Sequence, residues 1–232
     1  MGTWSSVRRV SSRNQRVDEG SAAVVPSPPE LLNSPNIVEL ERGELLHRVH
    51  DRAFAGDDFN PCRGGPTRFA PIRDQEGRCI PSLHAGTTLE SAIYETIFHD
   101  VPPSANRKTV PRGMVESCSH STLLMRRSLR LASLRAPDLM RWGVRRDVLI
   151  GSLPAQYART ALWAKAIHDQ FGDVHGLIWT SNLCDPEGAL LLFGDRVSAT
   201  DLLVAGVRAG TDGSFLGDVR TAGRRGAIWI TL

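Results

Sequence analysis

Residues 154–193 read PAQYARTALWAKAIHDQFGDVHGLIWTSNLCDPEGALLLF, and this stretch decides the fold class. Pro154 to Phe171 is rich in Ala, keeps helical periodicity and is followed by a glycine, so it predicts a helix. GLIWTS (176–181) and ALLLF (189–193) are short apolar runs typical of buried strands, joined by a loop that holds a proline and a glycine. A helix followed directly by two strands indicates a fold that mixes both elements.

The same mixture extends through the rest of the chain. Short runs of branched and aliphatic residues predict strands at Glu44–His50, Arg78–Ala85, Ser121–Leu134 (as one strand or two) and Ala227–Leu232. Pro81 makes the second of these an edge strand or a bulged strand. The elements alternate without a strict βαβ rhythm. We therefore predict an α+β fold with a compact mixed sheet and helices.

A second helix is predicted in the stretch before His99. Thr87 or Thr88 is a natural N-cap for a helix that runs to about His99. Its apolar stripe has the spacing i, i+3, i+4, i+7 and i+8 and consists of Leu89, Ala92, Ile93, Thr96 and Ile97. Glu95 lies about 130° from the centre of this stripe, on one line with Ser91 and His99. Glu95 therefore faces either solvent or a cleft beside the core.

Composition and charge limit the classes of function. The chain has 232 residues, with 28 basic and 25 acidic side chains and a net charge of +3, so it has no basic excess suited to coating nucleic acid. Residues 1–36 are rich in Ser, Arg, Asn and Pro and predict a flexible polar tail, whereas residues 37–232 predict the folded domain. No apolar run is long enough for a signal peptide or a membrane span, and we predict a cytoplasmic location without membrane contact.

Cysteines and histidines do not predict a metal site. Cys62, Cys79, Cys118 and Cys184 form no C-x-x-C pair, and we expect small buried hydrophobic side chains at these positions. His47 and His50 would point to opposite faces of a strand, which argues against shared metal ligation. The common nucleotide-loop, Rossmann, serine-hydrolase and zinc-protease signatures are also absent from the sequence.

Four polar residues stand at positions where the pattern of strands and helices alone favours apolar or neutral residues. Arg48 lies inside the apolar run LLHRVH, Arg68 follows a Gly-rich loop in GGPTRFAPI, Glu95 lies off the core stripe of its helix, and Ser181 ends GLIWTS. Each residue alone is compatible with a solvated or turn position.

The order of these four motifs resembles the RES domain family, which is named for its Arg, Glu and Ser. The matching stretches are LLHRVH, GGPTRFAPI, LHAGTTLESAIYETIFHD and GLIWTSNLCDPEGALLLFGDR, and they span about residues 44–196. The resemblance implies a compact relative of the ADP-ribosyltransferase toxin fold. It also implies a toxin that consumes NAD+ by hydrolysis or phosphorolysis, or that modifies a protein with ADP-ribose. The expected partner is an Xre-type antitoxin protein.

Carried over by position, the family Arg, Glu and Ser are Arg48, Glu95 and Ser181, and Arg68 matches a second recurrent Arg. His84 stands where many members have Tyr, and its flat ring can also stack on nicotinamide. These residues imply NAD+ as substrate rather than as cofactor, with Arg48, Arg68, His84 and Ser181 binding it and with Arg48, Glu95 and Ser181 serving catalysis.

This chemistry needs no metal. Nicotinamide leaves as a neutral molecule, so one carboxylate that stabilises an oxocarbenium-like transition state is sufficient, and Glu95 takes that role. Glu95 could also act as general base for the acceptor. Ser181 would hydrogen-bond the ribose or amide rather than attack.

Two other classes of function stay open at this level. One is a non-catalytic interaction module of the same fold. The other is nucleic-acid binding through RRSLR (126–130) and RRD (145–147), which we do not expect because neighbouring Arg residues in a strand point to opposite faces.

Overall fold

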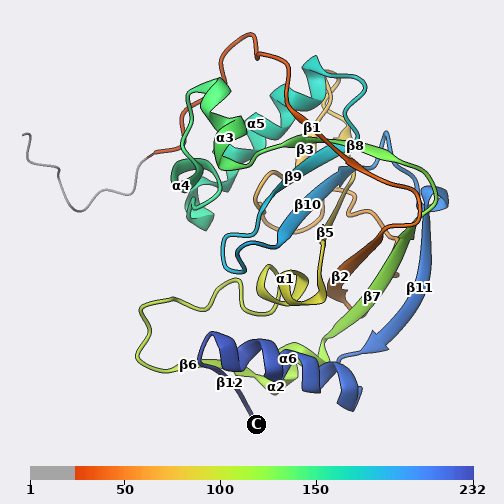
Figure 1. Cartoon of the computed structure of the whole chain (residues 1–232), viewed down its shortest axis with the longest axis vertical. Coiled ribbons are helices and arrows are strands. Elements are labelled where there is room, and N and C mark those ends of the chain that lie inside the picture. Colours follow the sequence, from red (N-terminus) through yellow and green to blue (C-terminus); the bar gives the residue numbers. More distant parts are fainter. Residues whose placement is uncertain (1–23) are drawn as a thin grey trace, which may run out of the picture.

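A computed structural model of the protein describes residues 24–232 (Figure 1). The described part contains a curved sheet of eight strands in the order β1-β8-β9-β10-β5-β2-β7-β11. Their bounds are β1 Ile37–Leu40, β2 Leu45–Asp51, β5 Ser82–Gly86, β7 Cys118–Met125, β8 Leu129–Ser133, β9 Gly176–Thr180, β10 Gly188–Phe193 and β11 Leu202–Ala209. Neighbouring strands are antiparallel except for the parallel pair β8 and β9. The predicted α+β class with a mixed sheet is confirmed.

The helices gather at two ends of this sheet (Figure 1). One group is α3 (Ala136–Leu139), α4 (Arg146–Leu149) and the long α5 (Tyr157–Gln170), with short 3-10 turns at Met140–Trp142 and Pro154–Gln156. The other group is α1 (Leu89–Tyr94), α2 (Arg112–Glu116) and α6 (Gly213–Arg225). A third 3-10 turn, Ala199–Asp201, precedes β11. Two small ribbons complete the fold: β3 (Ile72–Arg73) with β4 (Cys79–Ile80), and β6 (Lys108–Pro111) with β12 (Ile228–Thr231).

Each helix group covers its own apolar core. Trp163 of α5 packs in one buried cluster with Trp179 of β9 and Phe69, all of them nearly inaccessible to solvent. Phe215 of α6 and Phe98, just after α1, belong to a second cluster. Burial of such large side chains is the main source of stability. A cavity lined by residues of both clusters lies beside β5 and β10.

Several predicted elements change their limits in the structure. The helix before His99 has its N-cap at Thr88, as predicted, but its regular part ends at Tyr94. Pro81 divides the strand predicted at residues 78–85 into β4 and β5, and β5 is an interior strand of the main sheet rather than an edge. The run at residues 121–134 forms two strands, β7 and β8, which are not neighbours.

Residues 24–36 differ from the expected tail because they pack on the folded domain. Val25 and Leu32 are buried in the first cluster. Their backbone N–H groups donate to the side-chain oxygens of Gln156 (2.6 Å) and Gln170 (2.8 Å). The folded part therefore begins before residue 37, and the rest of the predicted tail, residues 1–23, lies outside the described residues.

The expectation for the cysteines is wrong for one pair. Cys62 and Cys79 form a disulfide across the loop that carries Arg68, whereas Cys118 and Cys184 are free and buried as expected. Spacing alone did not reveal the pair because Cys62, 17 residues before Cys79, reaches it by packing beside the β3–β4 ribbon, where its sulfur lies 3.6 Å from the Ile72 carbonyl oxygen. Disulfides are typical of oxidising compartments, so this one does not favour the predicted cytoplasmic location.

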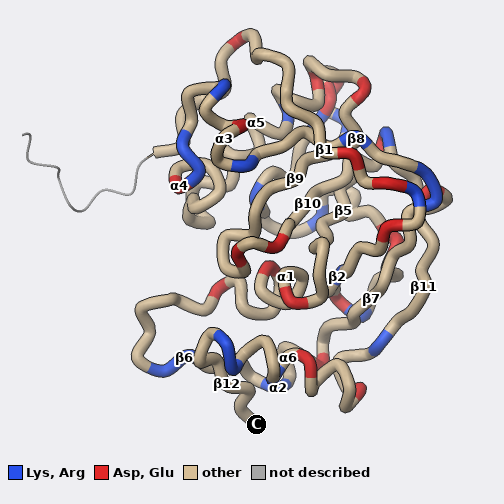
Figure 2. Tube along the Cα trace, in the orientation of Figure 1, with Lys and Arg blue, Asp and Glu red and all other residues tan. Residues whose placement is uncertain are grey.

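The structure bears on contacts with membranes and with nucleic acid. Within residues 24–232, no helix is long and apolar enough to cross a membrane. In the view of Figure 2, basic and acidic positions are interspersed along the trace. The RRSLR segment spans the turn between β7 and β8, where Arg127 pairs with Asp201.

Candidate active site

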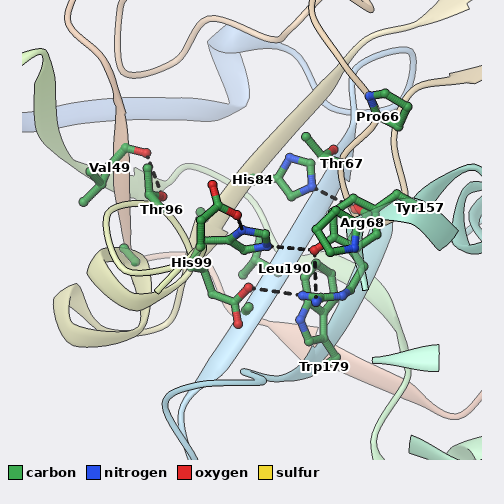
Figure 3. Close-up of a pocket in the computed structure, with 16 residues that line it drawn as sticks. Val49, Pro66, Thr67, Arg68, His84, Thr96, His99, Tyr157, Trp179 and Leu190 are labelled. Atoms are coloured by element: carbon green, nitrogen blue, oxygen red, sulfur yellow. Dashed lines mark hydrogen bonds and ion pairs between the residues drawn. The ribbon is translucent and has the colours of Figure 1, made fainter. Parts of the chain in front are cut away.

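A cavity of about 510 Å³ opens between α1, α5 and the centre of the sheet (Figure 3). Residues from β2, β5, β9, β10, α1, α5 and the loop before β3 line it. These residues are Val49, Pro66, Thr67, Arg68, His84, Ala85, Ala92, Glu95, Thr96, His99, Asp100, Pro154, Tyr157, Trp179, Ala189 and Leu190. An apolar wall with a few converging polar groups is typical of small-molecule sites.

Glu95 and Ser181 meet at this cavity. Glu95 is the C-cap of α1, and Ser181 directly follows β9. The Ser181 hydroxyl donates to Glu95 Oε1 over 2.6 Å, and the backbone N–H of Asn182 donates to the same oxygen over 2.9 Å. The position of Glu95 beside the core, rather than toward solvent, resolves the alternative left open by the helix pattern. Two donors on one oxygen fix the carboxylate and stabilise its charge.

Arg68 faces the second carboxylate oxygen. Its Nη1 lies 3.4 Å from Glu95 Oε2, and its Nη2 lies 3.3 Å from the Tyr157 hydroxyl (Figure 3). The guanidinium carbon lies 5.3 Å from the centre of the Tyr157 ring. Only 6% of the side chain is exposed, and its Nε has no hydrogen-bond partner among the described residues. A buried cation with long contacts and an unsatisfied donor is suited to binding an anionic group of a substrate.

His84 of β5 lies beside Arg68. Its Nε2 is 3.2 Å from the backbone oxygen of Arg68, which fits an Nε2–H that donates to the carbonyl. Burial lowers the pKa of His84, and the positive charges of Arg48 and Arg68 lower it further. The ring is therefore neutral at physiological pH and presents a flat surface to the cavity.

Arg48 of β2 does not line the cavity. It donates from Nη1 to the backbone oxygens of Gly56 (2.8 Å) and Asp58 (2.6 Å) and so anchors the loop before Arg68. Burial lowers the pKa of Arg48 to about 10, which still leaves it charged at neutral pH. Its role in binding NAD+ or in catalysis stays a prediction. Of the five predicted residues, Arg68, His84 and Glu95 line the cavity. Ser181 is outside the lining but contacts Glu95, and the Arg48 side chain donates hydrogen bonds to the loop before Arg68.

Tyr157 and His99 are two of the lining residues that the sequence analysis did not assign to the site. The Tyr157 hydroxyl lies 2.8 Å from His99 Nε2, and His99 Nδ1 lies 2.8 Å from Asp100 Oδ1. His99 stands four residues after Glu95, so the same helical line that marks Glu95 also marks His99. Tyr157 comes from the start of α5 and carried no signal in the sequence.

Among residues 24–232, no group of three or more His, Cys, Asp or Glu side chains is placed to hold a metal ion. The polar groups that line the cavity include a cation, Arg68, and a carboxylate, Glu95, which suit electrostatic stabilisation of an anionic group and of a developing positive charge.

Comparisons with known proteins identify a family and a similar fold. The family model described as RES domain matches residues 45–212, a range that includes Arg48, Arg68, Glu95 and Ser181. No curated protein matches the sequence. A solved structure titled as the crystal structure of the M. tuberculosis MbcT–MbcA toxin–antitoxin complex is similar in fold, with a TM-score of 0.57 and 13% identity. The match covers 79% of this chain and 92% of that one.

Proposed function

This chain belongs to the RES domain family, and from that membership and the geometry of the cavity we propose that it is a toxin that cleaves the nicotinamide–ribose bond of NAD+. The observation that carries the proposal is the contact of Glu95 with both Ser181 and Arg68 at one cavity. NAD+ is the substrate here, and no cofactor takes part.

Different residues of the cavity suit different parts of NAD+. Arg68 supplies an unpaired Nε donor, and its guanidinium fits the pyrophosphate or the adjacent ribose. His84 offers a neutral ring on which the nicotinamide or another flat group can stack, and Trp179 and Leu190 supply apolar wall. Positive charge develops on the ribose as the bond to nicotinamide breaks. The Glu95 carboxylate, held by Ser181, is placed to stabilise that charge without reorganisation.

A protein that destroys a central metabolite needs an inhibitor in its own cell. We propose an Xre-type antitoxin as that partner, on the basis of the RES family and of the similar fold found in a toxin–antitoxin complex. The antitoxin would act by covering the cavity or its mouth.

The decisive experiment follows NAD+ and released nicotinamide over time with purified protein, with and without phosphate. We expect wild type to release nicotinamide and the Glu95→Gln variant to release very little. Glu90→Gln is the matched control, because Glu90 lies on the same helix but pairs with Arg225 outside the cavity. Dependence on phosphate separates phosphorolysis from hydrolysis.

Absence of nicotinamide release under all conditions would exclude free NAD+ cleavage. Transfer of label from NAD+ to a protein would then support an ADP-ribosyltransferase. Stoichiometric NAD+ binding without turnover would support a non-catalytic interaction module.

A further inference from the structure

The polar groups at the cavity form one continuous chain from its floor to the protein surface. Glu95 contacts Arg68, Arg68 contacts the Tyr157 hydroxyl, and that hydroxyl contacts His99. His99 contacts Asp100, whose side chain is 79% exposed. The part from Tyr157 to Asp100 is not needed for holding Glu95, which already has Ser181 and Asn182 as donors.

One placement of the His99 hydrogen gives the chain a direction. When His99 Nδ1–H donates to Asp100 Oδ1, Nε2 is an acceptor. The Tyr157 hydroxyl then donates its hydrogen to His99 Nε2 over 2.8 Å. The Tyr157 oxygen accepts from Arg68 Nη2, and Tyr157 itself lines the cavity. This is the arrangement of a relay that takes a proton from the cavity and passes it outward.

Glu95 is poorly placed for the same task. Both of its carboxylate oxygens are already engaged, since Oε1 accepts two hydrogen bonds and Oε2 faces the Arg68 cation. An acceptor that attacks as a neutral O–H compound must nevertheless lose a proton. His99 is a lining side chain whose ring nitrogens join a cavity hydroxyl on one side to an aspartate on the other.

We propose that Tyr157 and His99, oriented by Asp100, accept the proton of the attacking water when NAD+ is hydrolysed. The inference rests on the proposed NAD+ cleavage and names water as the acceptor. The bond between ribose C1′ and the nicotinamide nitrogen breaks, and its electron pair leaves with neutral nicotinamide. The water oxygen bonds to C1′, its proton passes to the Tyr157 oxygen, and the Tyr157 proton passes to His99 Nε2. The resulting imidazolium lies beside the Asp100 carboxylate and releases its proton to solvent.

The state of Tyr157 agrees with a relay rather than with a phenolate base. Burial raises the pKa of Tyr157, so the hydroxyl keeps its proton at neutral pH. Its ring also supports the Arg68 guanidinium, and loss of the hydroxyl alone leaves that ring in place.

The test compares water with azide, an anion that attacks carbon without losing a proton. Nicotinamide release and the yields of ADP-ribose and of the ribosyl azide are measured in phosphate-free buffer for wild type, Tyr157→Phe and His99→Gln. We expect each variant to lower the ratio of water product to azide product about 100-fold, a typical effect of general base catalysis. Tyr94→Phe is the control, because the other tyrosine of the chain donates to Ala222 outside the cavity.

A second measurement, the solvent isotope effect, needs no azide. The solvent deuterium isotope effect on nicotinamide release in water should be above 1 in wild type and lost in His99→Gln. Asp100→Asn changes only an exposed side chain and should lower the water rate in the same direction.

Three outcomes would overturn the relay. Equal losses with water and azide would mean that Tyr157 and His99 only position Arg68. An unchanged water rate would remove both residues from the reaction. Nicotinamide release by wild type that requires phosphate would exclude water as the acceptor while leaving NAD+ cleavage intact. A wild-type protein that releases no nicotinamide under any condition would instead refute the proposed function on which the relay depends.

Discussion

Ser181 donates a hydrogen bond to Glu95 across 2.6 Å, although the two residues stand 86 positions apart in the chain. The contact joins the end of α1 to the end of β9 and is buried, since Ser181 has no exposed surface. Ser181 also accepts the backbone N–H of Cys184, so its hydroxyl hydrogen is directed at the carboxylate. Ser181 is therefore placed to orient Glu95. The sequence analysis expected Ser181 to contact the substrate directly, and experiments have to distinguish these two roles.

Glu95→Gln should reduce turnover of NAD+ by about 100-fold or more with a much smaller change in KM, because the carboxylate acts on charge that develops in the transition state. Ser181→Ala should reduce kcat by less, since Asn182 still donates to Glu95. Steady-state kinetics of nicotinamide release provide both constants. Near-normal turnover in Glu95→Gln would contradict the assignment.

Arg68→Lys should raise KM for NAD+ by about 10- to 100-fold, the loss of one or two charge-assisted hydrogen bonds, because an ammonium group does not reproduce the guanidinium fork. Folding should be little affected, as the positive charge next to Glu95 is kept. Isothermal titration with NAD+ and a thermal melt of the same samples separate the two effects. An unchanged affinity would remove Arg68 from the substrate site.

Arg48→Ala should act through the loop before Arg68. Loss of the bonds to the Gly56 and Asp58 carbonyls should cost about 1–3 kcal/mol of stability and weaken both NAD+ binding and turnover. Arg42→Ala is the control, because Arg42 is exposed and lies outside the cavity. Loss of NAD+ affinity without any loss of stability would instead indicate direct contact of Arg48 with substrate.

Local patterns in the sequence predicted the parts of the fold that local forces determine. The Thr88 cap, the α5 helix and the strands around Trp179 and Leu190 follow from side-chain chemistry and periodicity within a few residues. The side of α1 on which Glu95 lies was narrowed to two alternatives by the same periodicity.

The structural features that the sequence analysis did not predict depend on long-range packing. Tyr157 enters the cavity because α5 docks against the loop of Arg68, 89 residues away in sequence. Cys62 meets Cys79 beside the β3–β4 ribbon, with its sulfur near the Ile72 carbonyl oxygen. The Val25 carbonyl accepts a hydrogen bond from Arg159 of α5, 134 residues away in sequence. The composition of residues 24–36 is polar, but the segment buries Val25 and Leu32 and makes hydrogen bonds to the domain along its length, such as those of the Pro26 and Asn33 carbonyls with the indole N–H groups of Trp163 and Trp142.

The Cys62–Cys79 disulfide closes a loop that contains Arg68, so its removal should affect both stability and the site. The double variant Cys62→Ser/Cys79→Ser should lose about 2–4 kcal/mol of stability and bind NAD+ more weakly. Thermal melts with and without dithiothreitol test this, with a decrease expected for wild type and none for the double variant. Wild type that melts at the same temperature with and without reductant would show that the disulfide contributes nothing.

A buried histidine network predicts loss of stability in mild acid. His120 lies 3.0 Å from His47 and accepts a hydrogen bond from Arg208 at 3.1 Å. Burial and the Arg208 charge lower the pKa of His120 from 6.5 to about 4, and burial also lowers the pKa of His47. Between these pH values the unfolded chain binds more protons than the folded chain, so stability decreases as pH falls from about 6.5 to 4 and is not regained below that.

Urea denaturation at pH 7.5, 6 and 5 measures this dependence through the free energy of unfolding. His120→Gln should show a flatter pH dependence over the same interval, because it removes the group with the largest shift in this network. His99→Gln is the comparison variant, since it removes a histidine outside the network. The same slope in wild type and His120→Gln would show that other groups govern unfolding in acid.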